Sequence, residues 1–249
     1  MTGRSGRSLA AGLLLAAAAI GPASAQIPDT FKNLQLLPKE ISKPELVEVM
    51  RGFAGGLGVR CNHCHVGQNA ATLEGFDFSS DEKEQKKVAR AMMRMTREIN
   101  QTFLPATGRA NLTEVRCVTC HRGEVKPETL DRVVLAAIDE KGVPAGLDRY
   151  RELRGSAYGE GGYDFSARTL AIVAETLARD RKDLDGALSV VALNLEFHPE
   201  DPNVHLMQGE MLAKKGDKEG ALRSYRRCLE LQPENRRAKS QMEALTAAP

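Results

Sequence analysis

The chain has 249 residues, of which 42% are hydrophobic and 27% are charged. This composition is ordinary for a globular protein of one large or two small domains, and it excludes a wholly disordered chain. The 35 basic and 33 acidic residues give a formal charge of +2, so the chain lacks the basic field that recruits nucleic acid, and we expect no such partner.

Residues 1–25 have the layout of an export signal. Two arginines make a basic start, an apolar run follows at 9–20, and small residues at 23–25 form a cleavage site. The apolar run is about half of the ~20 residues that a membrane-spanning helix needs, and no later stretch comes close to that length. We therefore expect a mature chain that begins at Gln26, resides in the periplasm and has no transmembrane segment.

Two helices are predicted in the next hundred residues. The first spans Pro44 to Gly52, with Ser42 as its cap, and the glycines that follow it predict a tight loop open to close approach by a flat ligand. The second begins at Ser80 or Asp81. Its apolar stripe consists of Val88, Met92, Met95, Ile99 and Phe103. A Cys-x-x-Cys-His motif follows each helix, and this repeated order indicates an internal duplication.

The two motifs are Cys61–His65 and Cys117–His121. Two thiols three residues apart on a helical turn can each add to one vinyl group of a porphyrin, and the next residue then places an imidazole against the iron. The alternatives are disulfide or redox pairs and a single zinc site, but zinc would leave both histidines unexplained. We therefore predict two covalently attached haem c groups. Their predicted protein ligands are Cys61, Cys64 and His65 for the first and Cys117, Cys120 and His121 for the second.

Aromatic residues make up 4% of the chain and Trp is absent, so large core-filling side chains are scarce. A bound macrocycle would supply that apolar bulk.

An electron-carrying haem iron takes a sixth ligand, and a Met thioether opposite His raises its potential. Met50 is the only Met between the export signal and Cys61, which makes it the candidate for the first haem. Met92 and Met95 share the apolar stripe before the second motif, and periodicity does not choose between them. A Met on an apolar helix face is commonly a core residue, although here the core itself would be porphyrin.

The stretch from Leu34 to Gly123 resembles the cytochrome c subunit of photosynthetic reaction centres. The likeness is strongest in the nonapeptide Met92–Asn100 and in Cys117–Gly123. In that family each such haem is bound by a helix that bears a Met, a loop and a Cys-x-x-Cys-His motif. The resemblance therefore implies that Met50 and Met92 are the iron ligands and that the chain transfers electrons.

Two departures limit what the resemblance implies. Family members with four haems carry two further motifs, and a His shortly after the second helix serves another haem. This sequence has no third motif and no His between His65 and His121. The resemblance thus implies the two-haem portion alone, and it does not imply a photosynthetic partner.

The last 83 residues, 167–249, show a repeat. Ala187 and Ala221 are 34 residues apart, as are Pro199 and Pro233, and this is the period of tetratricopeptide (TPR) repeats. We predict two TPR-like repeats plus a closing helix, and such arrays bind protein partners. The glycine-rich segment before them, 131–166, is predicted to be a connector with short helical stretches.

The sequence thus predicts a mostly α protein, with a dihaem c-type cytochrome module at 26–130, the connector at 131–166 and the TPR-like repeats at 167–249. We expect it to exchange electrons with a redox protein and to dock a partner through the repeats, not to act as an enzyme. Two alternatives are a dihaem peroxidase-like enzyme with one haem open to substrate, and a haem redox sensor coupled to the repeats.

Overall fold

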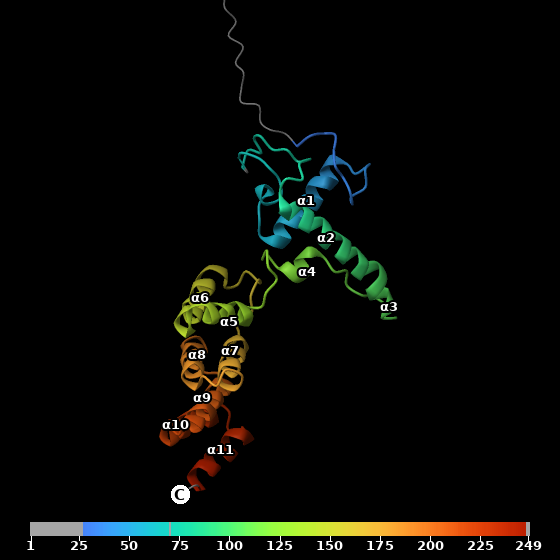
Figure 1. Ribbon diagram of the computed structural model, residues 1–249. Helices are drawn as coiled ribbons and strands as arrows, with labels where there is room; N and C mark the ends of the chain where they lie inside the picture. Colours follow the sequence, from blue (N-terminus) through green and yellow to red (C-terminus); the bar gives the residue numbers. More distant parts are fainter. Residues whose placement is uncertain (1–26, 70, 248–249) are drawn as a thin grey trace, which may run out of the picture. The chain divides into compact units, whose positions relative to one another are not determined.

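The computed structural model describes residues 27–69 and 71–247 (Figure 1). Within these residues the regular elements are helical, and the only β structure is a pair of isolated bridges, Val66 with Asp77 and Asn69 with Glu74. The prediction of a mostly α fold is confirmed. The predicted export signal lies outside the described residues. No helix in the described part of the chain is long and apolar enough to cross a membrane.

The chain divides into two compact units. One contains the described residues up to Leu46 together with Arg60–Met95, and the other contains Val47–Val59 together with the described residues from Thr96 onward. The boundaries cut through α1 (Lys43–Leu57) and α2 (Glu84–Glu98). Each unit therefore holds one Cys-x-x-Cys-His motif.

Helix α1 begins at the predicted cap. The Ser42 hydroxyl and main-chain N–H both donate to Oε2 of Glu45, at 2.6 and 2.9 Å, which satisfies groups that the first helical turn leaves open. The helix continues to Leu57, beyond the predicted end at Gly52, and stops where Gly58 adopts a φ of +65°. Most of the predicted glycine loop is therefore helical.

Helix α2 leads through one π-helical turn, η2 (Ile99–Phe103), and the short α3 (Leu104–Ala106) into an extended stretch before α4 (Cys117–His121). The Asn100 side chain ties this stretch back to η2. Its amide nitrogen donates to the Val115 carbonyl and its oxygen accepts from the Val115 N–H, both at 2.8 Å. One side chain thus fixes the backbone two residues before the second motif.

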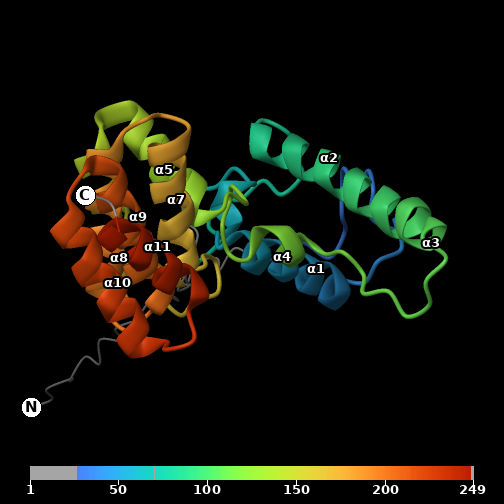
Figure 2. The same cartoon turned by 90° about the horizontal axis from the view of Figure 1, so that it is seen from below.

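The remaining helices pack in sequential pairs (Figures 1 and 2). We refer to α5–α11 as the helical array. Its members are α5 (Leu130–Lys141), α6 (Val143–Ala157), α7 (Ala167–Arg179), α8 (Leu184–Phe197), α9 (Pro202–Lys215), α10 (Lys218–Leu231) and α11 (Arg236–Ala247). The pairs are α5 with α6, α7 with α8 and α9 with α10, and α11 packs on α10.

The last two pairs repeat the same local structure at an interval of 34 residues. The Asp183 carboxylate accepts from the Gly186 N–H at 2.8 Å at the start of α8, and Asp217 accepts from Gly220 at 2.8 Å at the start of α10. Gly209 lies so close to the Tyr225 ring that a Cβ on this residue would be 2.5 Å from a ring atom. These features confirm the TPR-like repeats.

The segment 131–166, predicted as a connector, differs from that expectation. It contains nearly all of α5 and α6, whose buried side chains Val134, Ile138 and Tyr150 belong to the same core as α7 and α8. One of the glycines that suggested a linker has a packing role. Gly146 lets α6 approach α5 closely, since a Cβ at this position would lie 2.3 Å from the Ile138 side chain.

Buried hydrophobic side chains are distributed very unevenly. In the described part of the chain before Leu130, Leu46 is the only hydrophobic residue that is buried. All the other buried hydrophobic residues lie in the helical array or in the loop that joins α6 to α7. The part of the chain that contains the two Cys-x-x-Cys-His motifs therefore has almost no polypeptide core.

Candidate functional site

The first motif forms a single turn of 3-10 helix, η1 (Cys61–His63), continued by a further turn to His65. The main-chain N–H groups of Cys64 and His65 both donate to the Cys61 carbonyl, at 3.3 and 3.0 Å. Cys61 is exposed, Cys64 is half-buried, and both are free thiols. The two thiols thus project from one helical turn and are open to thioether formation.

His65 packs against Phe78, with the ring centroids 5.2 Å apart in an edge-to-face arrangement. Burial, together with the ammonium groups of Lys86 and Lys83, lowers the pKa of His65, so its imidazole is neutral at physiological pH. The neutral form is the one that binds metals. Among the described residues no hydrogen-bond partner reaches its buried Nδ1.

The loop after the first motif holds Phe78 against this histidine. Gly67 is required there, because a Cβ would lie 2.0 Å from the Phe76 ring. Lys86 donates to the carbonyl of Phe78 at 2.9 Å and also pairs with Asp81 at 3.3 Å. The Arg90 guanidinium holds the pKa of Asp81 well below its usual range. The charged residues at the start of α2 thus hold the loop that carries Phe78 in place.

The second motif is α4, in which Thr119 Oγ1 accepts from the Arg116 N–H at 3.0 Å. Cys117 is half-buried, Cys120 is exposed, and both thiols are free. The His121 Nδ1 lies 2.9 Å from the main-chain carbonyl oxygen of Glu124. Because a carbonyl only accepts, Nδ1 carries the proton and the Nε2 lone pair is left for a metal.

The end of α1 clamps this second motif. The Gly123 N–H donates to the Gly56 carbonyl at 3.0 Å, and a Cβ on Gly56 would lie 3.3 Å from Cβ of Cys117. A Cβ on Gly58 would lie only 2.0 Å from the Gly123 carbonyl oxygen. From the sequence we expected these glycines to allow a flat ligand to approach. Gly56 and Gly58 instead allow the backbone around the second motif to approach α1.

The methionines lie on the predicted helices. Met50 is half-buried on α1, whereas Met92 and Met95 on α2 are 39% and 46% exposed. Val88 and Phe103 of the same apolar stripe are also exposed, and no residue of α2 is buried. Each predicted ligand Met and its motif belong to different compact units, so the pairing of Met50 with the first haem and of Met92 with the second stays a prediction.

Taken together, the chemistry of these residues fits covalent haem. Paired free thiols suit thioether bonds, the imidazoles suit the iron, and the exposed apolar stripe suits the porphyrin face. Within residues 27–69 and 71–247, no three His, Cys, Asp or Glu side chains lie together as a metal-binding group.

Sequence reasoning missed Phe78 and Glu124. Phe78 lies 13 residues after His65 in a loop without periodicity, so nothing in the sequence links it to the imidazole. Glu124 contacts His121 through its main-chain carbonyl, which every residue type possesses. A local signal did exist in Gly123, since a glycine two residues after the motif allows the turn that brings this carbonyl back to the ring.

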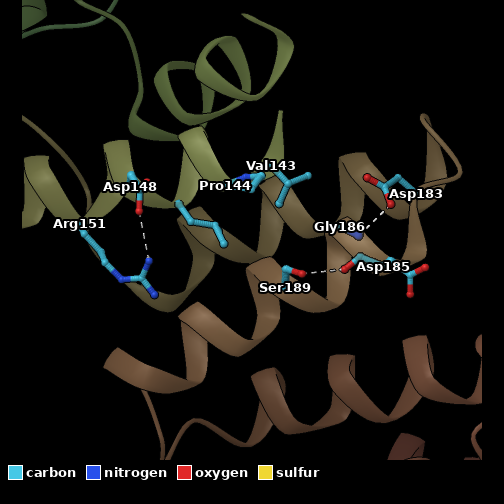
Figure 3. A pocket seen from close by; sticks show the side chains of 9 residues that line it. Val143, Pro144, Asp148, Arg151, Asp183, Asp185, Gly186 and Ser189 are labelled. Atoms are coloured by element: carbon cyan, nitrogen blue, oxygen red, sulfur yellow. Dashed lines mark hydrogen bonds and ion pairs between the residues drawn. The ribbon is translucent and has the colours of Figure 1, made fainter. Parts of the chain in front are cut away.

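A separate pocket of about 320 Å³ lies between the first turns of α6 and α8 (Figure 3). Its charged groups are engaged with their neighbours. Asp148 pairs with Arg151 at 3.7 Å, and Asp183 caps α8 (Figure 3). The remaining lining residues are Val143, Pro144, Leu147, Asp185, Gly186 and Ser189. This pocket contains neither a Cys nor a His and belongs to the helical array alone.

Comparison with known proteins gives a family match. The family described as "Photosynthetic reaction centre cytochrome C subunit" matches residues 11–147. Cytochrome c-554 of Chloroflexus aurantiacus is 34% identical over 96 residues, which are 39% of this chain and 21% of that protein. The photosynthetic reaction center cytochrome c subunit of Rubrivivax gelatinosus is 31% identical over 112 residues, or 44% of this chain and 26% of the relative. The chain thus spans about a quarter of the length of these curated relatives.

Among solved structures, the first TPR of Spaghetti (RPAP3) bound to the HSP90 peptide SRMEEVD is similar to 48% of this chain, over 89% of its own length. The TM-score is 0.35 and the sequence identity is 18%. Since this likeness is weak, the TPR-like repeats are identified from the helix pairs and their 34-residue interval.

The glycine clamp yields a testable prediction. Gly58→Ala is expected to lower the free energy of unfolding by about 1–3 kcal/mol, because the new Cβ is forced into a left-handed backbone and against the Gly123 carbonyl. The matched control is Gly52→Ala, at an open helical position, which is expected to be neutral or to stabilise by up to about 1 kcal/mol. Denaturant unfolding of both variants measures the difference, and equal values would contradict the clamp.

Proposed function

Because the chain belongs to the photosynthetic reaction centre cytochrome c subunit family, we propose that it is a dihaem c-type cytochrome that carries electrons. One haem c is attached at Cys61 and Cys64, and the other at Cys117 and Cys120. The observation that carries this proposal is the near absence of a polypeptide core around both motifs, where Leu46 is the only buried hydrophobic residue in the described part before Leu130.

The energetics support this proposal. Helices α1 and α2 have 15 residues each, and isolated helices of about 12–15 residues are marginal in water. Such helices need apolar packing, and fully burying one Val, Met or Phe side chain contributes about 1.5–3 kcal/mol. The polypeptide leaves Val88, Met92, Met95 and Phe103 exposed. Two porphyrins covering these faces would provide the missing core.

The residues of the chain then have distinct roles. The cysteines tether each porphyrin, and His65 and His121 present an imidazole to each iron. We assign Met50 and Met92 as the residues that would supply a thioether ligand to the first and the second haem. When bound, haem iron supplies a one-electron ferrous/ferric couple. Phe78 packs on the His65 ring and the Glu124 carbonyl accepts from His121, so both imidazoles would be held in place for a bound haem.

Export and docking complete the proposal. The layout of residues 1–25 supports export to the periplasm, where a redox protein would exchange electrons with the haems. The helical array supports docking of a protein partner, because stacked helix pairs form extended binding surfaces. We propose electron transfer in preference to enzymatic turnover, since each motif is preceded by a Met-bearing helix.

The number of haems is tested by intact mass. The mature protein, produced with the haem maturation machinery, is expected to exceed the polypeptide mass by two haems. Cys61→Ala/Cys64→Ala and Cys117→Ala/Cys120→Ala are each expected to retain one haem, because each pair forms its own thioether bonds. Denatured wild-type protein with one haem or none would overturn the proposal.

The axial ligands are tested by optical spectra. Met50→Ala and Met92→Ala are each expected to remove the sulfur-to-iron charge-transfer band of one ferric haem, because each loses a thioether ligand. Met95→Ala is the matched control, since Met95 lies on the same stripe and is expected to leave both bands intact. If Met95→Ala loses a band and Met92→Ala keeps both, Met95 and not Met92 is the ligand of the second haem. A high-spin ferric fraction in the wild type would favour the peroxidase-like alternative.

A further inference from the structure

The loop that joins α6 to α7 contacts the turn that follows the second motif. Gly162 of this loop is buried, and a Cβ there would lie 3.4 Å from both the Arg122 carbonyl oxygen and Oε1 of Glu124. The next residue, Tyr163, lines a cavity of about 370 Å³ together with Gly123 and Glu124. The helical array therefore reaches the three residues directly after His121.

Tyr163 joins this turn to the core of the array. Its ring packs on Phe165 with the centroids 6.3 Å apart, and Phe165 packs edge-to-face on the fully buried Tyr150 at 5.7 Å. On the other side Tyr163 lines the same cavity as Glu124. The pKa of Tyr163 is raised by burial and then by the negative charge of Glu124 and hydrogen bonding to its side chain.

Glu124 is bound to His121 at two main-chain points. Its carbonyl oxygen lies 2.9 Å from the His121 Nδ1, and its N–H donates to the His121 carbonyl at 2.8 Å. The turn between them contains two left-handed residues, Arg122 at a φ of +50° and Gly123 at +91°. Such a turn needs outside contacts to hold its shape; Gly56 and Gly162 contact it directly, and Tyr163 follows Gly162 in the chain.

We propose that Tyr163 is a positioning residue for the iron ligand His121, and that it couples the helical array to the second haem. It acts through Glu124, whose carbonyl fixes the ring orientation and the Nδ1 proton of the histidine. A hydrogen bond from Nδ1–H makes an imidazole a stronger donor to its metal. A partner that moves the loop between α6 and α7 therefore changes the potential of this haem. The inference rests on the proposed function, since it requires a haem at Cys117 and Cys120.

The test is Tyr163→Phe, which removes the hydroxyl and keeps the ring that packs on Phe165. The matched control is Tyr158→Phe, in the same loop, where the hydroxyl belongs to a ring that is 62% exposed and packs on Arg154. Both variants are made in the Cys61→Ala/Cys64→Ala background, so that only the second haem is observed. Intact mass and the thermal unfolding midpoint establish that each variant is folded and carries its haem.

The midpoint potential is expected to rise in Tyr163→Phe, because a looser Nδ1–H bond weakens donation to ferric iron, and to stay unchanged in Tyr158→Phe. The NMR signals of the His121 ring protons in the ferric protein are expected to shift in the first variant only. A haem-bound Tyr163→Phe protein with wild-type potential and wild-type His121 signals overturns this inference alone. Absence of haem at Cys117 and Cys120 in the wild type overturns the proposed function, and this inference with it.

Discussion

The interaction on which we propose the N-terminal part of this chain depends is the burial of apolar helix faces against covalently bound haem. Helices α1 and α2 carry apolar residues at helical spacing, yet Leu46 is the only one of them that the polypeptide buries fully. In our proposal, contact with haem supplies the rest of the hydrophobic effect that normally holds such helices together. Scarce aromatic residues and the absence of Trp agree with this, because a porphyrin replaces large side chains as the core filler.

The helical array is stabilised in the opposite way, by its own side chains. Its helix pairs bury two clusters of hydrophobic residues, one around Tyr150 and one around Tyr225, and the starts of α8 and α10 are fixed by aspartate caps. The helix pairs thus supply their own core. Contact between Gly162 and the turn after His121 joins the helical array to the second motif. In our proposal this contact links partner docking to electron transfer.

The sequence revealed those features that depend on residue type at fixed spacing. Thioether chemistry dictates Cys-x-x-Cys-His, helix capping dictates Ser42 with Glu45, and helix stacking dictates the 34-residue period. Features that depend on close backbone approach escaped it, because glycine has several uses. Gly146 was taken as part of a linker although it seats α6 on α5, and Gly56 and Gly58 meet residues some 60 positions away. The role of the Glu124 carbonyl was also hidden, since any residue supplies one.

Hydrogen exchange of the haem-bound protein, compared with the Cys61→Ala/Cys64→Ala/Cys117→Ala/Cys120→Ala variant, tests most directly whether haem provides the N-terminal core. We predict that the amides of α1 and α2 lose their protection in the variant, because their apolar faces return to water, whereas α7–α10 keep theirs. Equal protection of α1 and α2 in both proteins would contradict this, since it would mean that the polypeptide alone stabilises these helices.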